Sequence, residues 1–346
     1  MNWILTVIAL GIVIFIHELG HFWMAKRAGI GVLEFAVGMG PAIWSKKVGE
    51  TFYSLRVLPI GGYVKMAGLE STEDVPDELN FYKKSILDRL LTVLAGPFIN
   101  IFSGWLVFVL LFTLSGKPEL NPQIAQVVPN SIAAKAHIQP GDTITAVNNI
   151  PVQNVITDIV LKIRHTPNQA LTLTLSRQGQ TLTTTVIPEG KIPHIGITLT
   201  PVLHRYSLGD ALKAGTEETW HQIQMIGTTL KQLVSGQVQV REVAGPVGIV
   251  QMANSGLDRG FIPFISIMAM ISISLGVANL LPFPVLDGGH VVLLALEAIL
   301  GRRLPAKVEQ GLFYVGAAVL ISLMILIVGN DIFQFKDRIL ILKGLK

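Results

Sequence analysis

The stretch GIVIFIHELGHFWMAK, residues 11–26, combines two features that rarely occur together. Most of it is apolar enough to cross a membrane, yet it contains His17, Glu18 and His21. A polar side chain in hydrocarbon is costly unless it finds a partner, so such residues usually mark a functional site. We therefore expect a membrane helix whose polar side chains share a specific partner.

The composition of the whole chain agrees with a membrane location. Of its 346 residues, 50% are hydrophobic and only 14% are charged, whereas an ordinary soluble domain has roughly 25% charged residues. The net charge is +4, and no basic patch is interleaved with aromatic residues, so we expect no nucleic-acid partner. The chain has no cysteine, which excludes disulfides, thiolate catalysis and cysteine-ligated zinc.

Four stretches are long and apolar enough to be membrane spans, at about 20 residues per span. The first lacks a basic n-region and a cleavage site, and it is too long for a signal-peptide core, so we expect it to be retained. The third is too long for one straight helix and is interrupted by NLLPFPVLDGGH, residues 279–290. The four predicted spans are residues 3–25, 90–114, 261–300 and 311–328.

The distribution of Lys and Arg predicts the orientation of these spans. Basic residues are frequent between spans one and two and again between spans three and four, so both loops should be cytoplasmic. The segment 117–259 and both termini would then lie outside. Basic residues in the tail, 336–346, favour the opposite orientation.

The outer segment has the texture of a soluble domain. Residues 115–202 alternate short β-rich runs with turn signals, including a hairpin over 170–190 and a short amphipathic helix over 155–165. The segment 203–260 contains apolar residues at helical spacing. This amphipathic helical segment would pack against another part of the protein or lie on the membrane surface.

The loop after the first span contains TFYSLRVLPIGGYVKM, residues 51–66, which is β-rich and unusually apolar for a solvated loop. Sheet at membrane depth is tolerated only where protein or a water-filled cavity satisfies its backbone. Two interpretations are open: a hairpin that dips towards the polar site, and a simple cytoplasmic hairpin.

The motif H-E-x-x-H gives the polar residues of the first span a chemical purpose. On a helix, His17 and His21 lie one turn apart on one face, so two imidazoles can bind one cation. Glu18 is rotated away by about 100°, where it can reach a water on that metal without binding it. This is the zinc motif in which the glutamate acts as general base. The alternative is a hydrogen-bonded cluster between helices without metal.

A catalytic zinc needs a third protein ligand and an open position for water. In the interrupted third region, Pro282 and Pro284 prevent regular helix, and a glycine pair follows Asp287. Asp287 is our candidate third ligand. His290 is a rival ligand, and Asp287 could instead only cap the following helix.

These motifs together resemble the site-2 proteases, which are zinc intramembrane metalloproteases. The resemblance covers nearly the whole chain and includes HELGH, AGPFIN, a PDZ domain and NLLPFPVLDGGH. It implies that zinc is the cofactor, that His17, His21 and Asp287 are its ligands, and that Glu18 activates water. It also implies a membrane-associated β-hairpin that pairs with an unwound substrate. The substrate-binding residues implied are Asn279, Pro282, Pro284, Gly61 and Gly62.

The resemblance also implies an organisation, a location and partners. We expect a polytopic α-helical membrane protein of about four spans in the bacterial cytoplasmic membrane, with the active site in the cytoplasmic half. The regions expected are an N-terminal membrane region (1–114), an extracytoplasmic PDZ domain (115–202), an amphipathic segment (203–260), a C-terminal membrane region (261–335) and a tail (336–346).

The expected substrates are single-span membrane proteins within the lipid bilayer, such as trimmed anti-sigma factors or remnant signal peptides. The PDZ domain would exclude bulky ectodomains or bind a peptide C-terminus. We favour exclusion, because its loops show no obvious Arg or Lys for a carboxylate. Two other classes remain open: a zinc transporter, although the polar motifs do not repeat, and an inactive PDZ receptor that retains the fold.

Overall fold

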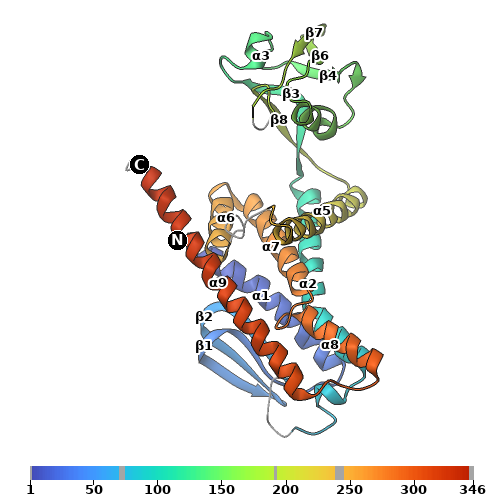
Figure 1. Ribbon diagram of the computed structural model, residues 1–346, viewed down its shortest axis with the longest axis vertical. Helices are drawn as coiled ribbons and strands as arrows, with labels where there is room; N and C mark the ends of the chain where they lie inside the picture. Colours follow the sequence, from blue (N-terminus) through green and yellow to red (C-terminus); the bar gives the residue numbers. More distant parts are fainter. Residues whose placement is uncertain (1, 70–74, 191–192, 238–244, 343–346) are drawn as a thin grey trace. The chain divides into compact units, whose positions relative to one another are not determined.

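The computed structural model describes residues 2–69, 75–190, 193–237 and 245–342 (Figure 1). The chain forms two compact units: unit 1 contains Met1–Leu111 and Leu208–Lys346, and unit 2 contains Phe112–Ser207. The main helices that begin in unit 1 are α1 (Asn2–Arg27), α2 (Ile86–Leu114), α5 (Leu208–Val234), α6 (Pro246–Asp258), α7 (Phe261–Asn279), α8 (Asp287–Leu300) and α9 (Ala306–Leu342).

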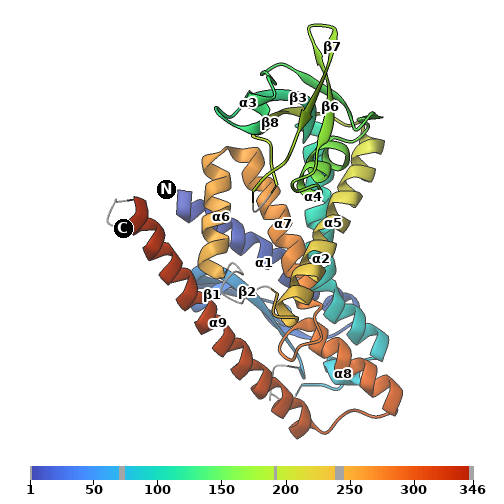
Figure 2. The ribbon, with the colours of Figure 1, turned by 45° about the horizontal axis from the view of Figure 1, so that its top comes forward.

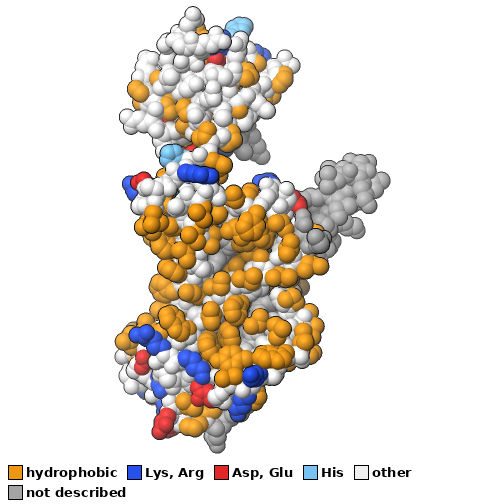
Figure 3. Space-filling view, turned by 180° about the vertical axis from the view of Figure 1, so that it is seen from behind, with side chains coloured by type: hydrophobic (Ala, Val, Ile, Leu, Met, Phe, Trp, Pro, Cys, Tyr) orange, Lys and Arg blue, Asp and Glu red, His pale blue; other side chains and the backbone are white. Residues whose placement is uncertain are grey.

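The predicted membrane spans are confirmed by length and composition. Among the described residues, four helices could cross a membrane: Trp3–Arg27, Ile86–Leu114, Phe261–Asn279 and Ala306–Asp331. In the lower part of Figure 3, the surface of unit 1 carries a broad apolar belt, with charged side chains gathered beyond its lower end. Only 6% of the most apolar stretch of the last span is buried inside the protein, as expected for a helix that faces lipid. Helix α9 then continues to Leu342, across the boundary predicted at residue 335.

The third hydrophobic region breaks where the sequence predicted. Helix α7 ends at Asn279 and α8 begins at Asp287. Proline at 282 and 284 explains the break, because proline cannot donate a backbone hydrogen bond and clashes with the preceding helical turn. The turn between the two helices ends at the carboxylate of Asp287, the first residue of α8.

A β-hairpin follows α1, but residues 51–66, predicted to form a hairpin by themselves, make up only its second strand. Strand β1 (Val32–Val48) and strand β2 (Thr51–Met66) pair antiparallel, with Val48 opposite Thr51 at the turn. The inner part of β1 has partners on two sides, since Val37 is opposite both Gly62 and Leu55. The hairpin therefore folds back on itself into a small sheet, in which Gly62–Met66 pairs with the start of β1.

Aromatic side chains attach this sheet to α1. Phe35 of β1 lies 5.7 Å from Phe15 and 4.8 Å from Phe22, measured between ring centroids. Tyr53 of β2 also contacts Phe22, at 5.9 Å. Figures 1 and 2 both show the hairpin beside α1. Because α1 carries His17 and His21, these contacts fix the hairpin beside the polar motif.

Unit 2 is a β-rich domain with its own hydrophobic core. Its sheet has the order β7-β6-β4-β3-β8, and β5 pairs with β4. The core contains alternate residues of β6 together with helical residues such as Ile159. The elements are β3 (Lys117–Val127), α3 (Ile132–Lys135), β4 (Thr143–Val147), β5 (Ile150–Pro151), η2 (Ile156–Leu161), α4 (Lys162–His165), β6 (Leu171–Arg177), β7 (Gln180–Val186) and β8 (Ile197–His204).

The local predictions for unit 2 are confirmed. Strands β6 and β7 form the predicted hairpin, with Arg177 opposite Gln180, and η2 with α4 forms the predicted short helix. A partly buried ion pair also lies in this unit: Asp142 is 1% exposed and accepts hydrogen bonds from the more exposed Arg177 at 2.7 and 2.8 Å. The Arg177 guanidinium holds the pKa of Asp142 below its ordinary value.

The segment predicted as one amphipathic region contains two described helices, α5 and α6. Residues 238–244 lie outside the described part of the chain. Helix α5 packs on α2 within unit 1, because a Cβ at Gly215 would meet Val109 at 2.7 Å. Large apolar residues of the predicted stripe, Leu212 and Trp220, are nevertheless exposed, so the choice between packing and the membrane surface stays open for α5.

Candidate metal centre

The two histidines of the first span point to one place. Both lie on α1, four residues apart, and their exposures are 6% for His17 and 7% for His21. Their Nε2 atoms are 3.2 Å apart. A regular helix over this apolar stretch is enough to produce this arrangement, as the sequence predicted.

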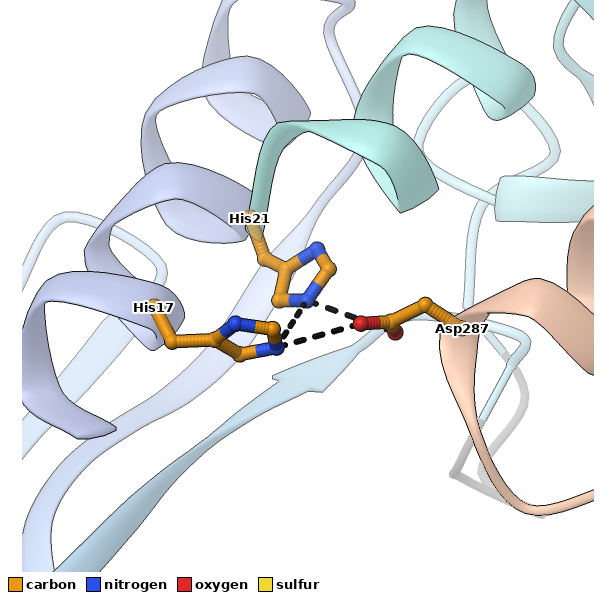
Figure 4. A group of neighbouring side chains, drawn as sticks. All are labelled: His17, His21 and Asp287. Carbon is orange, nitrogen blue, oxygen red and sulfur yellow. Dashed lines mark hydrogen bonds and ion pairs between the residues drawn. The ribbon is translucent and has the colours of Figure 1, made fainter. Parts of the chain in front are cut away.

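Asp287, the first residue of α8, points towards both histidines (Figure 4). Its carboxylate oxygens lie 3.1 Å from Nε2 of His17 and 3.4 Å from Nε2 of His21. The turn before it is strained, because Val285 has φ of 84°, a conformation that β-branched residues rarely adopt. A Cβ at Gly288 would be 2.2 Å from the carbonyl oxygen of Leu281, so only glycine fits behind the carboxylate.

The three side chains fit a zinc ion. Their ligand atoms all lie within 4.8 Å of one another, and the three nearest separations are 3.1, 3.2 and 3.4 Å. Ligands at 2.0–2.1 Å from a tetrahedral zinc are separated by about 3.3 Å. One carboxylate oxygen of Asp287 is buried without a hydrogen-bond partner. Three such donor groups that face one another in an apolar interior can share a cation, and two imidazoles with one carboxylate are a donor set suited to zinc.

Helix α2 supplies contacts that the sequence reasoning did not identify. Nδ1 of His21 lies 2.8 Å from the backbone carbonyl oxygen of Thr92, so His21 can donate its proton there and keep Nε2 free for a metal. At Gly96 a Cβ would be 2.2 Å from Nε2 of His21 and 2.8 Å from Nε2 of His17. The sequence did contain a signal for these contacts: small or polar residues recur every four positions in an otherwise apolar helix, at Thr92, Gly96 and Asn100.

Glu18 follows His17 on α1, and it lies close to the hairpin. It is partly buried on α1. The backbone of Gly62 in β2 approaches it, since a Cβ at Gly62 would be 3.6 Å from Cγ of Glu18. That Cβ would also collide with the carbonyl oxygen of Ala36 at 2.6 Å. The hairpin thus reaches the metal motif through a position that only glycine can occupy.

The remaining predicted residues lie on the elements next to those that carry this centre, or in the turn that leads to it. Asn279 is the last residue of α7, Pro282 and Pro284 lie in the turn before Asp287, and Gly61 precedes Gly62 in β2. No described contact tests their role with substrate.

His290, the rival third ligand, is outside the group that brings metal-binding atoms together. Its ring packs instead against Phe313 of α9 in a tilted arrangement, with the ring centroids 4.8 Å apart. Among the residues that the structure describes, the group able to hold a metal is therefore His17, His21 and Asp287.

Fold and site together define a class: a polytopic membrane protein with a metal centre built from buried residues of its helices. Comparison with known proteins makes the assignment specific. The chain belongs to peptidase family M50, the site-2 protease family, which matches residues 5–323. It is a zinc metalloprotease, and this assignment replaces the transporter interpretation.

Similar proteins cover nearly the whole chain. A protein of Clostridium acetobutylicum is 36% identical over 337 residues, 96% of this chain and 97% of its own length. The zinc metalloprotease RasP of Geobacillus kaustophilus is 30% identical over 409 aligned positions, 95% of this chain and 97% of RasP. The regulator of sigma-E protease RseP of Escherichia coli is 29% identical over 438 positions, 94% of this chain and 97% of RseP. The RseP alignment is longer than this chain of 346 residues, so RseP contains insertions.

Proposed function

We propose that this protein is an intramembrane endopeptidase that cleaves the transmembrane segments of single-span membrane proteins. In this proposal His17, His21 and Asp287 hold the zinc, and Glu18 is the general base. The observation that carries it is the convergence of the three side chains, with separations of 3.1–3.4 Å: two come from α1, which is long and apolar enough to span a membrane, and the third comes from the start of the shorter α8.

The chemistry follows from the position of each group. When bound, zinc polarises the scissile carbonyl and lowers the pKa of water to about 7. Glu18, one residue from His17, accepts a proton from the attacking water and returns it to the leaving amine. The apolar helices around the site exclude bulk water, which strengthens these electrostatic interactions.

The substrate has to be presented as an extended strand, because the backbone of an intact helix is already hydrogen-bonded internally. We assign this task to the hairpin at Gly61 and Gly62 and to the turn that contains Asn279, Pro282 and Pro284. The approach of Gly62 to Glu18 supports the assignment, because a strand added along this part of the hairpin would lie beside the general base.

Unit 2 is proposed to be a PDZ domain that restricts access to the site. A groove of about 450 Å³ lies along β8 and is also lined by residues of η2 and α4. Strand β8 is at the end of the sheet, so its outer edge could accept a further strand. Arg164 lines this groove, which gives the peptide-binding mode a cation that the sequence had not indicated.

Because Arg164 offers a cation to a bound peptide, the sequence argument for steric exclusion of bulky ectodomains no longer decides between the two modes, and we propose both for test. A deletion distinguishes them, and the structure suggests where to make it: Lys117 pairs with His204, so the ends of the excised segment are adjacent and a short linker can join them. If unit 2 excludes ectodomains, the deletion allows an untrimmed substrate to be cut. If unit 2 captures a peptide, the deletion slows cutting of the trimmed substrate. An unchanged pattern on both substrates would refute both modes.

We propose the bacterial cytoplasmic membrane as the location, with unit 2 outside and the hairpin of β1 and β2 on the cytoplasmic side. The absence of cysteine makes this testable without background labelling. Single cysteines at Ser45 in β1 and Thr181 in β7 should react with an impermeant maleimide from opposite sides of oriented vesicles. Labelling of both from one side would refute the topology.

The function itself is tested with the purified full chain in lipid vesicles containing a single-span substrate that has a short ectodomain. We expect zinc-dependent cleavage, with the cut mapped by mass spectrometry to the hydrophobic segment. Cleavage only outside the hydrophobic segment would refute intramembrane proteolysis while leaving the family assignment intact.

A further inference from the structure

Asn100 is a fully buried amide on α2, with an exposed fraction of 0%, in a helix that is otherwise mostly apolar. Its backbone is held from two sides, because its carbonyl oxygen accepts hydrogen bonds from Ser103 at 3.0 Å and from Ser272 of α7 at 2.9 Å. Burying an amide is costly, so its side chain needs a partner. That partner lies on α1.

The side chain of Asn100 faces His17 on the ring nitrogen that points away from the metal centre. Nδ2 of Asn100 is 3.4 Å from Nδ1 of His17. The other end of the amide, Oδ1, is buried and has no hydrogen-bond partner. An acceptor is thus left unpaired a short distance from an imidazole nitrogen that can carry a proton.

The zinc site determines which end of the amide should face the ring. Nε2 of His17 faces His21 and Asp287, so it needs its lone pair to bind a metal. The single proton of the neutral imidazole must then be on Nδ1, which becomes a donor and requires an acceptor. The two ends of an amide have nearly the same shape, so a 180° rotation about the last side-chain bond brings Oδ1 to this place.

We propose that Asn100 is a positioning residue for the metal centre: its Oδ1 accepts a hydrogen bond from Nδ1–H of His17 and fixes the tautomer that binds zinc through Nε2. The contact between His21 and the carbonyl of Thr92 is the corresponding interaction for the second histidine, at 2.8 Å. One face of α2 thereby orients both imidazoles, with Gly96 leaving room for the rings between these two contacts.

The proposal rests on the proposed zinc ligands, and its test reads metal binding by the apo full chain. The probes are Zn²⁺, in competition with a chromophoric chelator, and Co²⁺, through its visible absorption spectrum. Asn100→Leu removes the acceptor at similar volume. Asn100→Asp presents only oxygens, so it retains the acceptor and removes the donor. Loss of a hydrogen-bond partner of this kind typically weakens metal affinity 10- to 100-fold.

We expect Asn100→Leu to weaken Zn²⁺ affinity 10- to 100-fold and to change the Co²⁺ spectrum, while Asn100→Asp stays within threefold of the wild type. Ser272→Ala is the matched control: it removes a hydrogen bond to the backbone of Asn100 but leaves the amide, and should bind zinc normally.

Equal affinities for Asn100→Leu and the wild type would overturn the proposal. A loss of Zn²⁺ affinity in Asn100→Asp as large as that in Asn100→Leu would also overturn it, because that result would mean that the amide acts as a donor or through packing and not as an acceptor. If Asn100→Leu does not fold, the Zn²⁺ affinity of the folded, monodisperse fraction of Asn100→Asp decides the proposal alone. His17→Ala separates a failure of the Asn100 proposal from a failure of the proposed zinc ligands: normal zinc binding without His17 would refute the ligand set itself.

Discussion

The close approach of α2 to the histidines gives a sharp prediction for Gly96. A single methyl group there would lie 2.2 Å from Nε2 of His21 and 2.8 Å from Nε2 of His17. Ordinary contact begins near 3.4 Å, so His21 and α2 would have to separate by about 1.2 Å. Zinc–nitrogen bonds tolerate deviations of only about 0.2 Å, so both imidazoles cannot keep their places on the metal.

We therefore expect Gly96→Ala to lower zinc affinity at least tenfold and activity at least 100-fold, the loss typical of a misplacement of about 1 Å in an active site. The assay is metal content of the purified protein after dialysis against a defined zinc buffer, measured beside the cleavage rate. Thermal unfolding of the same samples reports whether the variant remains folded.

Gly104→Ala is the control on the same helix. Its methyl group would lie 2.6 Å from Cγ1 of Ile273 and 2.8 Å from the carbonyl oxygen of Ala269, so it disturbs the packing of α2 on α7 and not the ligands. We expect lower stability with normal zinc content. Full zinc and full activity in Gly96→Ala would refute the reasoning, and so would equal zinc loss in both variants.

Two further predictions concern α8. Asp287→Ala should lose zinc and activity, whereas His290→Ala should retain both, because His290 packs on Phe313 outside the metal-binding group; metal analysis showing the reverse order would make His290 the ligand. Arg89 is 3% exposed and donates to both carboxylate oxygens of Glu297 at 2.9 and 2.7 Å, joining α2 to α8. Arg89→Met should destabilise the protein towards the lower end of roughly 3–5 kcal/mol, since Glu297 is partly exposed, and adding Glu297→Leu should recover much of the loss in thermal unfolding. No recovery in the double variant would contradict this account.

The sequence was most informative where polar residues interrupt hydrophobic segments. Polar residues at membrane depth are costly and usually functional, which is why the sequence could predict His17, Glu18, His21 and Asp287 as site residues. The same logic located the break between α7 and α8, since proline makes its position evident. Alternation of Leu and Thr was sufficient for the β6–β7 hairpin.

The sequence was least informative where two elements approach closely. Gly62 and Gly96 matter because of what a Cβ would strike on another element, and no local pattern contains that information. Strand β1 was not predicted, because glycines and a proline at 38–41 interrupt its apolar pattern. In the structure these residues belong to a strand that bends, where Gly38 and Gly40 have φ of 88° and 85°.

The central claim is that Glu18 performs the proton transfers at a zinc site that other residues hold. Glu18→Gln tests it most directly, because the substitution retains the size of the side chain and leaves all three proposed ligands in place. The measurement is the cleavage rate of a single-span substrate by purified wild type and variant at matched zinc content. The account predicts normal zinc binding and a rate reduced by about 10²–10⁴-fold, the usual contribution of a general base. A variant that binds zinc and cleaves at the wild-type rate would contradict it.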